Sequence, residues 1–137
     1  MTDLDLLAKK LAFIEGCLRE LRDLARPEQI EVDVRERRFV EHTLQIAIQA
    51  AQDVASHIVS DERLGEPRTN HELFSLLAGR GWITPKLEMT LREMIGFRNV
   101  LVHGYTSVDP RIVRDVAEHR LEDLQSFVDQ VRARLGS

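Results

Sequence analysis

Apolar residues return every three or four positions along most of this chain, and this spacing restricts it to a bundle of packed α-helices. The first stripe of this kind consists of Leu4, Leu7, Leu11, Ile14, Leu18, Leu21 and Ala25. Residues three and four apart lie on one face of an α-helix, so the stripe predicts an amphipathic helix with one buried face. We find no stretch with the alternating spacing of a half-buried strand, and we predict an all-α fold.

Capping residues, prolines and glycines mark the expected helix boundaries. Thr2 is the predicted N-cap of the first helix, and Pro27 is predicted to end it. The later helices have start signals at Asp33, Thr69, Thr84–Pro85 and Asp109–Pro110. Gly79 and Gly104 are predicted to end the third and fourth helices. We therefore expect a bundle of about five helices, the fifth running from Pro110 to the C-terminus, in a single domain of residues 1–137.

The composition narrows the class of protein. The net charge is −4, which provides no overall basic field for nucleic acid, although residues 80–120 hold seven Lys or Arg and five Asp or Glu. The single cysteine, Cys17, allows no intrachain disulfide, and we expect a small buried hydrophobic residue there. A signal-peptide pattern is missing, and no apolar run approaches the ~20 residues of a membrane span. We expect a cytoplasmic protein.

The stretch RNVLVHGY, residues 98–105, departs from the helical pattern. Arg98 takes a place on an apolar stripe. The other members of that stripe are Leu87, Leu91, Met94 and Leu101. A charge on a buried face is costly unless it is paired or faces a wet cavity or an interface. We expect His103 to be the last residue of this helix and Tyr105 to lie just beyond Gly104.

Arg98 and His103 are a candidate catalytic pair for cleaving RNA without a metal ion. An arginine binds phosphate oxygens and stabilises added negative charge, and a histidine exchanges protons near neutral pH, so that a ribose 2′-oxygen attacks its own phosphate. Asn99 is a candidate for orienting the histidine or the phosphate. Tyr105 is a candidate for binding a base or the phosphate, or for being modified itself.

The spacing of the pair raises a geometric difficulty. Five positions correspond to ~140° around a straight helix, so Arg98 and His103 do not stack on one another. They converge if the helix loosens before Gly104, if the long arginine reaches over, or if two protomers each contribute one residue. The sequence leaves these three arrangements open.

A purely structural interpretation of the same residues is also open. His103 would then cap the helix C-terminus, where the helix dipole favours it, and Tyr105 would serve packing. Arg98 would pair with an acid from a neighbouring helix. Asp53, near the end of the predicted second helix, either points into a pocket or is solvated, and we keep it as a supporting site residue.

Motifs for cofactors are missing from the sequence. We find neither a phosphate-binding P-loop nor an H-E-x-x-H zinc motif. We therefore expect no cofactor and no metal site.

RNVLVHGY, on the penultimate predicted helix of a short all-helical chain, resembles the HepT-like branch of the HEPN superfamily. The segments RFVEHTLQIAIQAAQDVASHIVS and NHELFSLL and the connector GWI resemble this family as well, so the resemblance covers essentially the whole chain. It implies a homodimer in which the R-x4-H motifs of two subunits meet in a cleft. It further implies a ribonuclease toxin of type VII toxin–antitoxin pairs, with transfer RNA as one plausible target class and with Arg98 and His103 as the catalytic pair.

The resemblance also implies a partner protein. Toxins of this family are usually encoded beside a small nucleotidyltransferase antitoxin, which can transfer AMP onto the tyrosine of R-x4-H-x-Y. That tyrosine is Tyr105 here, and Asn99 also fits the family pattern. The chain lacks the paired-aspartate Gly-Ser motif of such a transferase, so it would be the acceptor. Two other functions stay open: a non-catalytic RNA- or nucleotide-binding dimer that acts through its partner, and a helical protein that mainly dimerises and binds a neighbouring protein.

Overall fold

Six α-helices and one short 3-10 helix make up the part of the chain that the structure describes, residues 3–103 and 108–136 of a computed structural model. Their bounds are α1 Leu4–Leu24, η1 Pro27–Gln29, α2 Val34–Asp61, α3 Asn70–Gly79, α4 Pro85–His103, α5 Pro110–His119 and α6 Leu121–Leu135. Within these residues there is no β-strand. The prediction of an all-α bundle is confirmed.

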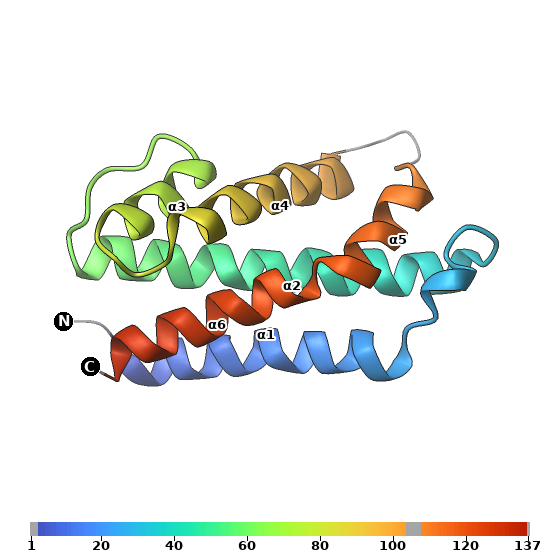
Figure 1. Cartoon of the computed structure of the whole chain (residues 1–137), viewed down its shortest axis with the longest axis horizontal. Helices are drawn as coiled ribbons and strands as arrows, with labels where there is room; N and C mark the ends of the chain where they lie inside the picture. The colour runs from blue at the N-terminus through green and yellow to red at the C-terminus, as the bar shows by residue number, and fades with distance from the viewer. Residues whose placement is uncertain (1–2, 104–107, 137) are drawn as a thin grey trace.

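The longest helix, α2, is the centre of the bundle. It packs against α1, α3, α4, α5 and α6. α3 and α4 lie along one side of α2 and α1 along the other, and α1 begins and α6 ends at the same end of the molecule (Figure 1). Its buried residues lie on more than one face and include Val40, Leu44, Ile48, Ala51 and Ala55. A helix that is apolar on more than one face has to contact several neighbours, which explains its central position.

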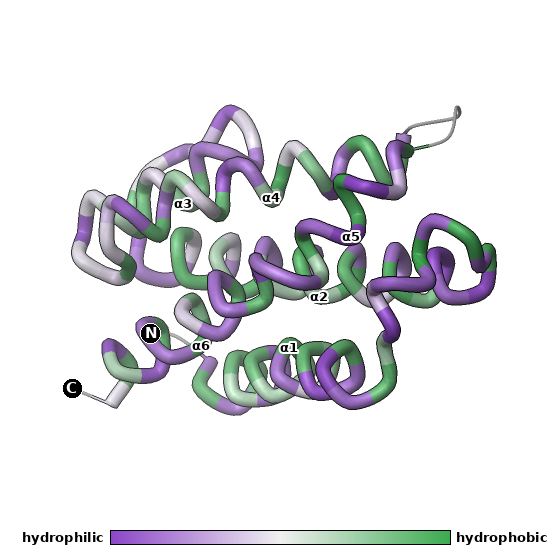
Figure 2. The backbone as a smooth tube through the Cα atoms, turned by 45° about the vertical axis from the view of Figure 1, so that its right-hand side comes forward, coloured by the Kyte–Doolittle hydropathy of each residue, from purple (hydrophilic) through white to green (hydrophobic). Residues whose placement is uncertain are grey.

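The predicted apolar stripe of α1 forms part of the core. Its buried members are Leu7, Leu11, Ile14, Leu18 and Leu21. Leu4 is 59% exposed, since it is the first residue of the helix and lies beyond the packed region. Cys17 is only 2% exposed, as expected. Hydrophobic sections follow hydrophilic ones turn by turn along the helices, as expected for helices with one buried face (Figure 2). Burial of each such leucine contributes roughly 1.5–3 kcal/mol to folding.

The helix starts follow the predicted caps with one exception. The side chains of Asp33 and Thr69 accept hydrogen bonds from the backbone N–H groups at the starts of α2 and α3, and Asp109 does the same for α5. For α1 the cap is Asp3, whose carboxylate accepts from Leu6 N at 3.1 Å. The prediction of Thr2 was wrong because the next residue brings a charged acceptor to the positive end of the helix dipole.

α3 ends one residue later than the sequence predicted, and the left-handed residue of the following turn lies two positions later. Gly79 is still part of α3, and the residue with a left-handed backbone is Gly81, with φ 77°. The N–H groups of Arg80 and Gly81 donate to the last carbonyls of α3, which extends the hydrogen-bonded turn as far as Gly81. Trp82 follows, 5% exposed, with the Arg134 guanidinium 5.3 Å from its ring centre.

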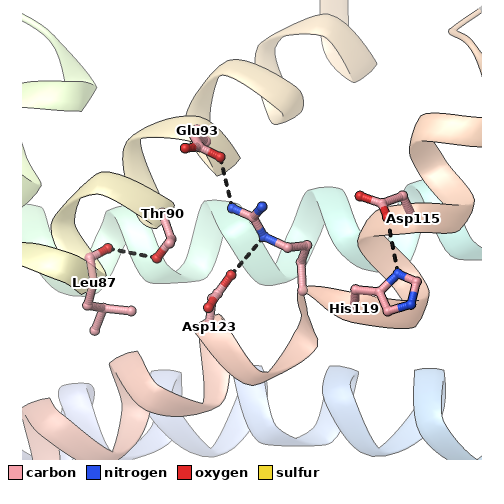
Figure 3. Close-up of polar contacts among 7 residues, drawn as sticks. Leu87, Thr90, Glu93, Asp115, His119 and Asp123 are labelled. Atoms are coloured by element: carbon pink, nitrogen blue, oxygen red, sulfur yellow. Dashed lines mark hydrogen bonds and ion pairs between the residues drawn. The ribbon is translucent and has the colours of Figure 1, made fainter.

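The last predicted helix is split into α5 and α6 at Arg120, so the bundle has one α-helix more than the five we expected. The Arg120 backbone has φ −117° and ψ 3°, outside the α-helical range. Its side chain donates to Glu93 of α4 and to Asp123 of α6, both at 2.9 Å (Figure 3). The apolar spacing continues across the break without a proline or glycine, so the sequence pattern contains no signal for it.

Among the described residues, none of the helices has both the length and the apolar composition that crossing a lipid bilayer requires.

Candidate functional site

Arg98 lies in the penultimate turn of α4, half-buried, with its guanidinium directed at α2. One terminal nitrogen, Nη2, donates to Oε1 of Gln49 at 2.5 Å. The other, Nη1, donates to Oδ1 of Asn99 at 3.3 Å. Nε is buried without a hydrogen-bond partner in the described part of the chain. The hydrogen-bond partners of the Arg98 guanidinium are therefore two neutral side-chain amides, those of Gln49 and Asn99.

The structural interpretation of Arg98 was wrong on this point. It required an acid from a neighbouring helix, but no carboxylate of the described residues forms an ion pair with this guanidinium. The arginine keeps its positive charge uncompensated at close range. A guanidinium held in this way is suited to binding an anion such as a phosphate.

Asp53 belongs to the same group of contacts, but it reaches Arg98 only through Gln49. The Nε2 of Gln49 donates to Oδ1 of Asp53 at 3.0 Å, one turn away on α2. Lys10 of α1 contacts the other carboxylate oxygen at 3.5 Å, in a partly exposed pair that contributes little to stability. The row Lys10, Asp53, Gln49, Arg98 thus joins α1, α2 and α4.

A cavity of about 460 Å³ lies beside this row, between α1 and α2. Gln49, Asp53 and Lys10 form part of its wall, and so does Phe13, which is 48% exposed. The rest of the lining is Leu6, Lys9, Ile46 and Ala50. Gln49 therefore contacts Arg98 and also lines a cavity that a ligand can enter.

His103 is the last residue of α4, as the sequence predicted, and its side chain is exposed. The structure does not bring it to Arg98: no hydrogen bond joins the two among the described residues. α4 stays α-helical through His103, so the helix does not loosen there, and the arginine points to Gln49 instead of reaching over. Of the three arrangements that the sequence left open, the one with two protomers fits this geometry.

Gly104 and Tyr105 lie outside the described residues. The expectations that Gly104 ends α4 and that Tyr105 follows it as a modified residue stay predictions.

No group of three His, Cys, Asp or Glu side chains comes together as a possible metal cluster in residues 3–103 and 108–136. The expected absence of a metal and of a cofactor also stays a prediction. His57, one turn after Asp53, is turned to Asp61 at 3.0 Å and takes no part in the row of contacts around Arg98.

Gln49 is the residue of this region that sequence reasoning missed. Gln49 lies on the long central helix α2, and no distinctive sequence pattern surrounds it. The one available signal was its spacing of four from Asp53, which places an amide donor and a carboxylate on the same helix face.

The model of the HepT-like ribonuclease family matches residues 14–131, which include Gln49, Asp53, Arg98 and His103. The chain belongs to the HepT-like ribonuclease family. The resemblance that the sequence predicted is thereby confirmed, and Arg98 and His103 are part of a HepT-like domain.

Two curated relatives and one solved structure agree with this membership. The mRNA nuclease HepT of Shewanella oneidensis is 33% identical over 130 residues, 94% of this chain and 98% of that protein. The tRNA nuclease HepT of Aphanizomenon flos-aquae is 34% identical over 97 residues, 71% and 66% of the two chains. The solved structure is a tri-AMPylated Shewanella oneidensis HEPN toxin in complex with MNT antitoxin. It is 33% identical with a TM-score of 0.87, over 97% of this chain and 99% of that one.

Proposed function

We propose that this chain is the toxin of a toxin–antitoxin pair and that it cleaves RNA without a metal ion. The observation that carries the proposal is the Arg98 guanidinium, held by neutral amides in the domain of a HepT-like ribonuclease. The named relatives support RNA as the substrate class, since one is an mRNA nuclease and another a tRNA nuclease. These two targets differ, so we propose RNA cleavage in general and leave the target class open.

The proposed catalytic residues are Arg98 and His103, with Asn99 and Asp53 in support. A ribose 2′-oxygen attacks the adjacent phosphorus, and the bond from phosphorus to the 5′-oxygen of the next nucleotide breaks. His103 of one copy removes the proton of the 2′-hydroxyl and passes it to water, and a water molecule gives a proton to the leaving 5′-oxygen. Arg98 stabilises the negative charge that gathers on the phosphate oxygens. The products are a 2′,3′-cyclic phosphate and a 5′-hydroxyl.

This reaction needs two copies of the chain, and we propose a homodimer with the two R-x4-H motifs at its interface. Support comes from the separation of the pair within one chain, where Arg98 is held against α2 and His103 is exposed at the helix end. We propose one domain, residues 1–137, in each copy, because the buried residues of all six helices form one continuous core.

We also propose a nucleotidyltransferase antitoxin as partner and Tyr105 as the residue that it modifies with AMP. The solved relative supports this, since it is a tri-AMPylated toxin bound to MNT antitoxin. We further propose that the chain acts in the cytoplasm, where an RNA substrate and a nucleotide-dependent partner are both present.

RNA cleavage is tested with the purified chain and a labelled RNA in the presence of EDTA. We expect cleavage that persists in EDTA and products that end in a 2′,3′-cyclic phosphate or its 3′-phosphate hydrolysis product. The His103→Ala variant is expected to lose at least ~100-fold in rate. A matched control is His119→Ala, another exposed helix-end histidine, which pairs with Asp115 and is expected to cleave at the parent rate. Equal rates for parent and His103→Ala would refute the assignment.

The modification is tested by co-expression with the neighbouring nucleotidyltransferase and measurement of intact mass. We expect mass added in multiples of one AMP unit, and none in Tyr105→Phe. Unchanged addition in that variant would rule out Tyr105. If the parent binds intact RNA tightly but leaves it uncut over a range of pH, the non-catalytic binding function replaces the one proposed here.

A further inference from the structure

We infer that Gln49 is a positioning residue for the proposed RNA cleavage: it holds Arg98 through a neutral hydrogen bond and thereby leaves the charge of the arginine available for a phosphate. The inference rests on the proposed function, because it concerns the same arginine. Two hydrogen bonds support the inference: Arg98 Nη2 donates to Gln49 Oε1, and Gln49 Nε2 donates to Asp53.

The two partners determine which way the Gln49 amide faces. A guanidinium has only donors and a carboxylate has only acceptors. The amide oxygen must therefore face Arg98 and the amide nitrogen must face Asp53, at 2.5 Å and 3.0 Å. The spacing of four on α2 keeps Gln49 and Asp53 on one helix face, so the orientation is built into the helix.

The same arrangement keeps Asp53 from neutralising Arg98. A direct, bidentate ion pair would occupy the guanidinium fork, and a phosphate would then have to displace a carboxylate. With the amide between them, each terminal nitrogen of Arg98 uses one N–H on a neutral acceptor, Gln49 or Asn99. The second N–H of each nitrogen has no partner among the described contacts. A guanidinium with an N–H left on each terminal nitrogen has two donors for the oxygens of a phosphate.

Lys10 completes the arrangement from the far side. It contacts the Asp53 oxygen that does not bond Gln49, at 3.5 Å. Both oxygens of the carboxylate thus have a partner other than Arg98, a cation for one and an amide for the other.

A test of this role must separate it from a mere structural link between α2 and α4. Two substitutions do so. Gln49→Met removes both hydrogen bonds and adds no charge. Gln49→Glu keeps an acceptor for Arg98 but makes it a carboxylate, which pairs with the guanidinium. Since this glutamate also faces Asp53, the double variant Gln49→Glu/Asp53→Asn removes that repulsion and keeps the new ion pair. Gln45→Met is the matched control, a half-buried glutamine one turn earlier on α2.

The first measurement is binding of a 2′-O-methyl RNA oligonucleotide, which cannot be cleaved because the attacking hydroxyl is blocked. For Gln49→Glu, with and without Asp53→Asn, we expect at least ~10-fold weaker binding and a salt dependence of log Kd smaller by about 0.7, one phosphate contact on a single strand. For Gln49→Met we expect an unchanged salt dependence, Kd within about 3-fold of the parent, and a kcat on cleavable RNA lower by ~10-fold because the arginine is no longer oriented. Gln45→Met should match the parent in all three.

The second measurement repeats Gln49→Glu in an Arg98→Ala background. If Gln49 acts through Arg98, the glutamate has no further effect on Kd there, because its target is gone. The inference is overturned if the glutamate weakens binding equally in both backgrounds, if Gln49→Glu and Gln49→Met behave alike, or if both bind and cleave like the parent. Failure of the parent itself to cleave RNA would instead refute the proposed function.

Discussion

Arg98 is the residue that sets this protein apart from an ordinary helical bundle. Its place on an apolar stripe showed from the sequence that it needed a partner or an interface, and the structure supplies Gln49 and Asn99. The identity of these partners could not be predicted. Whether an arginine on α4 meets an acid or an amide on α2 depends on how the two helices are rotated against one another, which a linear pattern does not specify.

The first prediction at this scale concerns the geometry of the cationic group at position 98. Arg98→Lys keeps the positive charge but replaces the planar fork by a single ammonium group, which has no second nitrogen to contact Asn99 and no fork for bidentate binding of a phosphate. We expect an RNA cleavage rate lower by ~100-fold, with the free energy of unfolding changed by less than about 1 kcal/mol. Arg92→Lys, an exposed arginine on the same helix that pairs with Glu88, is the control and should cleave normally. Full activity of Arg98→Lys would contradict the role of the fork.

The second prediction concerns Cys17. Burial raises the pKa of its thiol, with a smaller contribution from Glu20. A raised pKa lowers the fraction of reactive thiolate at pH 8, and burial blocks access as well. We expect iodoacetamide to modify the native protein at least ~100-fold more slowly than the protein unfolded in urea, as followed by mass spectrometry. Equal rates in the two states would show that the α1 face carrying Cys17 is not packed.

Most element boundaries were predictable because they are local. Asp33, Thr69 and Asp109 cap helices through bonds to N–H groups two or three residues away, and such bonds depend on short-range sequence alone. The split between α5 and α6 was not predictable, since Arg120 is held by Glu93, which is 27 positions away. A hydrogen bond between residues so far apart in the sequence depends on the tertiary structure, and the spacing of the apolar residues does not reveal it.

The third prediction concerns the contact between α1 and α6. Glu15 accepts from Arg132 at 2.7 Å and from Gln125 at 3.1 Å, and these bonds lower the pKa of its carboxyl from the ordinary value of 4.5. A lowered folded-state pKa contributes stability above pH 4.5, and this contribution is lost as the pH falls through the folded-state pKa. We expect Glu15→Gln to lose less than about 1 kcal/mol of unfolding free energy at pH 7.

The sign of this effect is checked by urea unfolding at several pH values. The difference between parent and Glu15→Gln should shrink as the pH is lowered, because the parent then carries a neutral carboxyl group as well. Glu20→Gln, which changes an exposed carboxylate on the same helix, should show no such convergence. A gap between parent and Glu15→Gln that stays constant with pH would show that the ion pair is not its source.

At the scale of the whole molecule, the bundle supports the proposal that cleavage needs two copies of the chain. Its core holds α4 firmly against α2 and α3, so the turn carrying Arg98 faces α2 while His103 is exposed at the helix end. The fold class was predictable from periodicity, and the family from RNVLVHGY and the surrounding segments. The angle of ~140° between Arg98 and His103 was predictable for a straight helix. Which of the three ways of converging applies was not, because it depends on where the long arginine side chain finds its partner.

The most direct test of a site shared between two copies is to mix Arg98→Ala and His103→Ala protomers and to measure RNA cleavage. Each variant alone is expected to be inactive. In a mixed dimer one site loses both residues, and the other combines the intact Arg98 of one copy with the intact His103 of the other. If subunits exchange at random, about half the dimers are mixed and each has one working site, so about a quarter of the parent activity should return. No recovered activity, with mixed dimers confirmed by mass, would contradict the shared site.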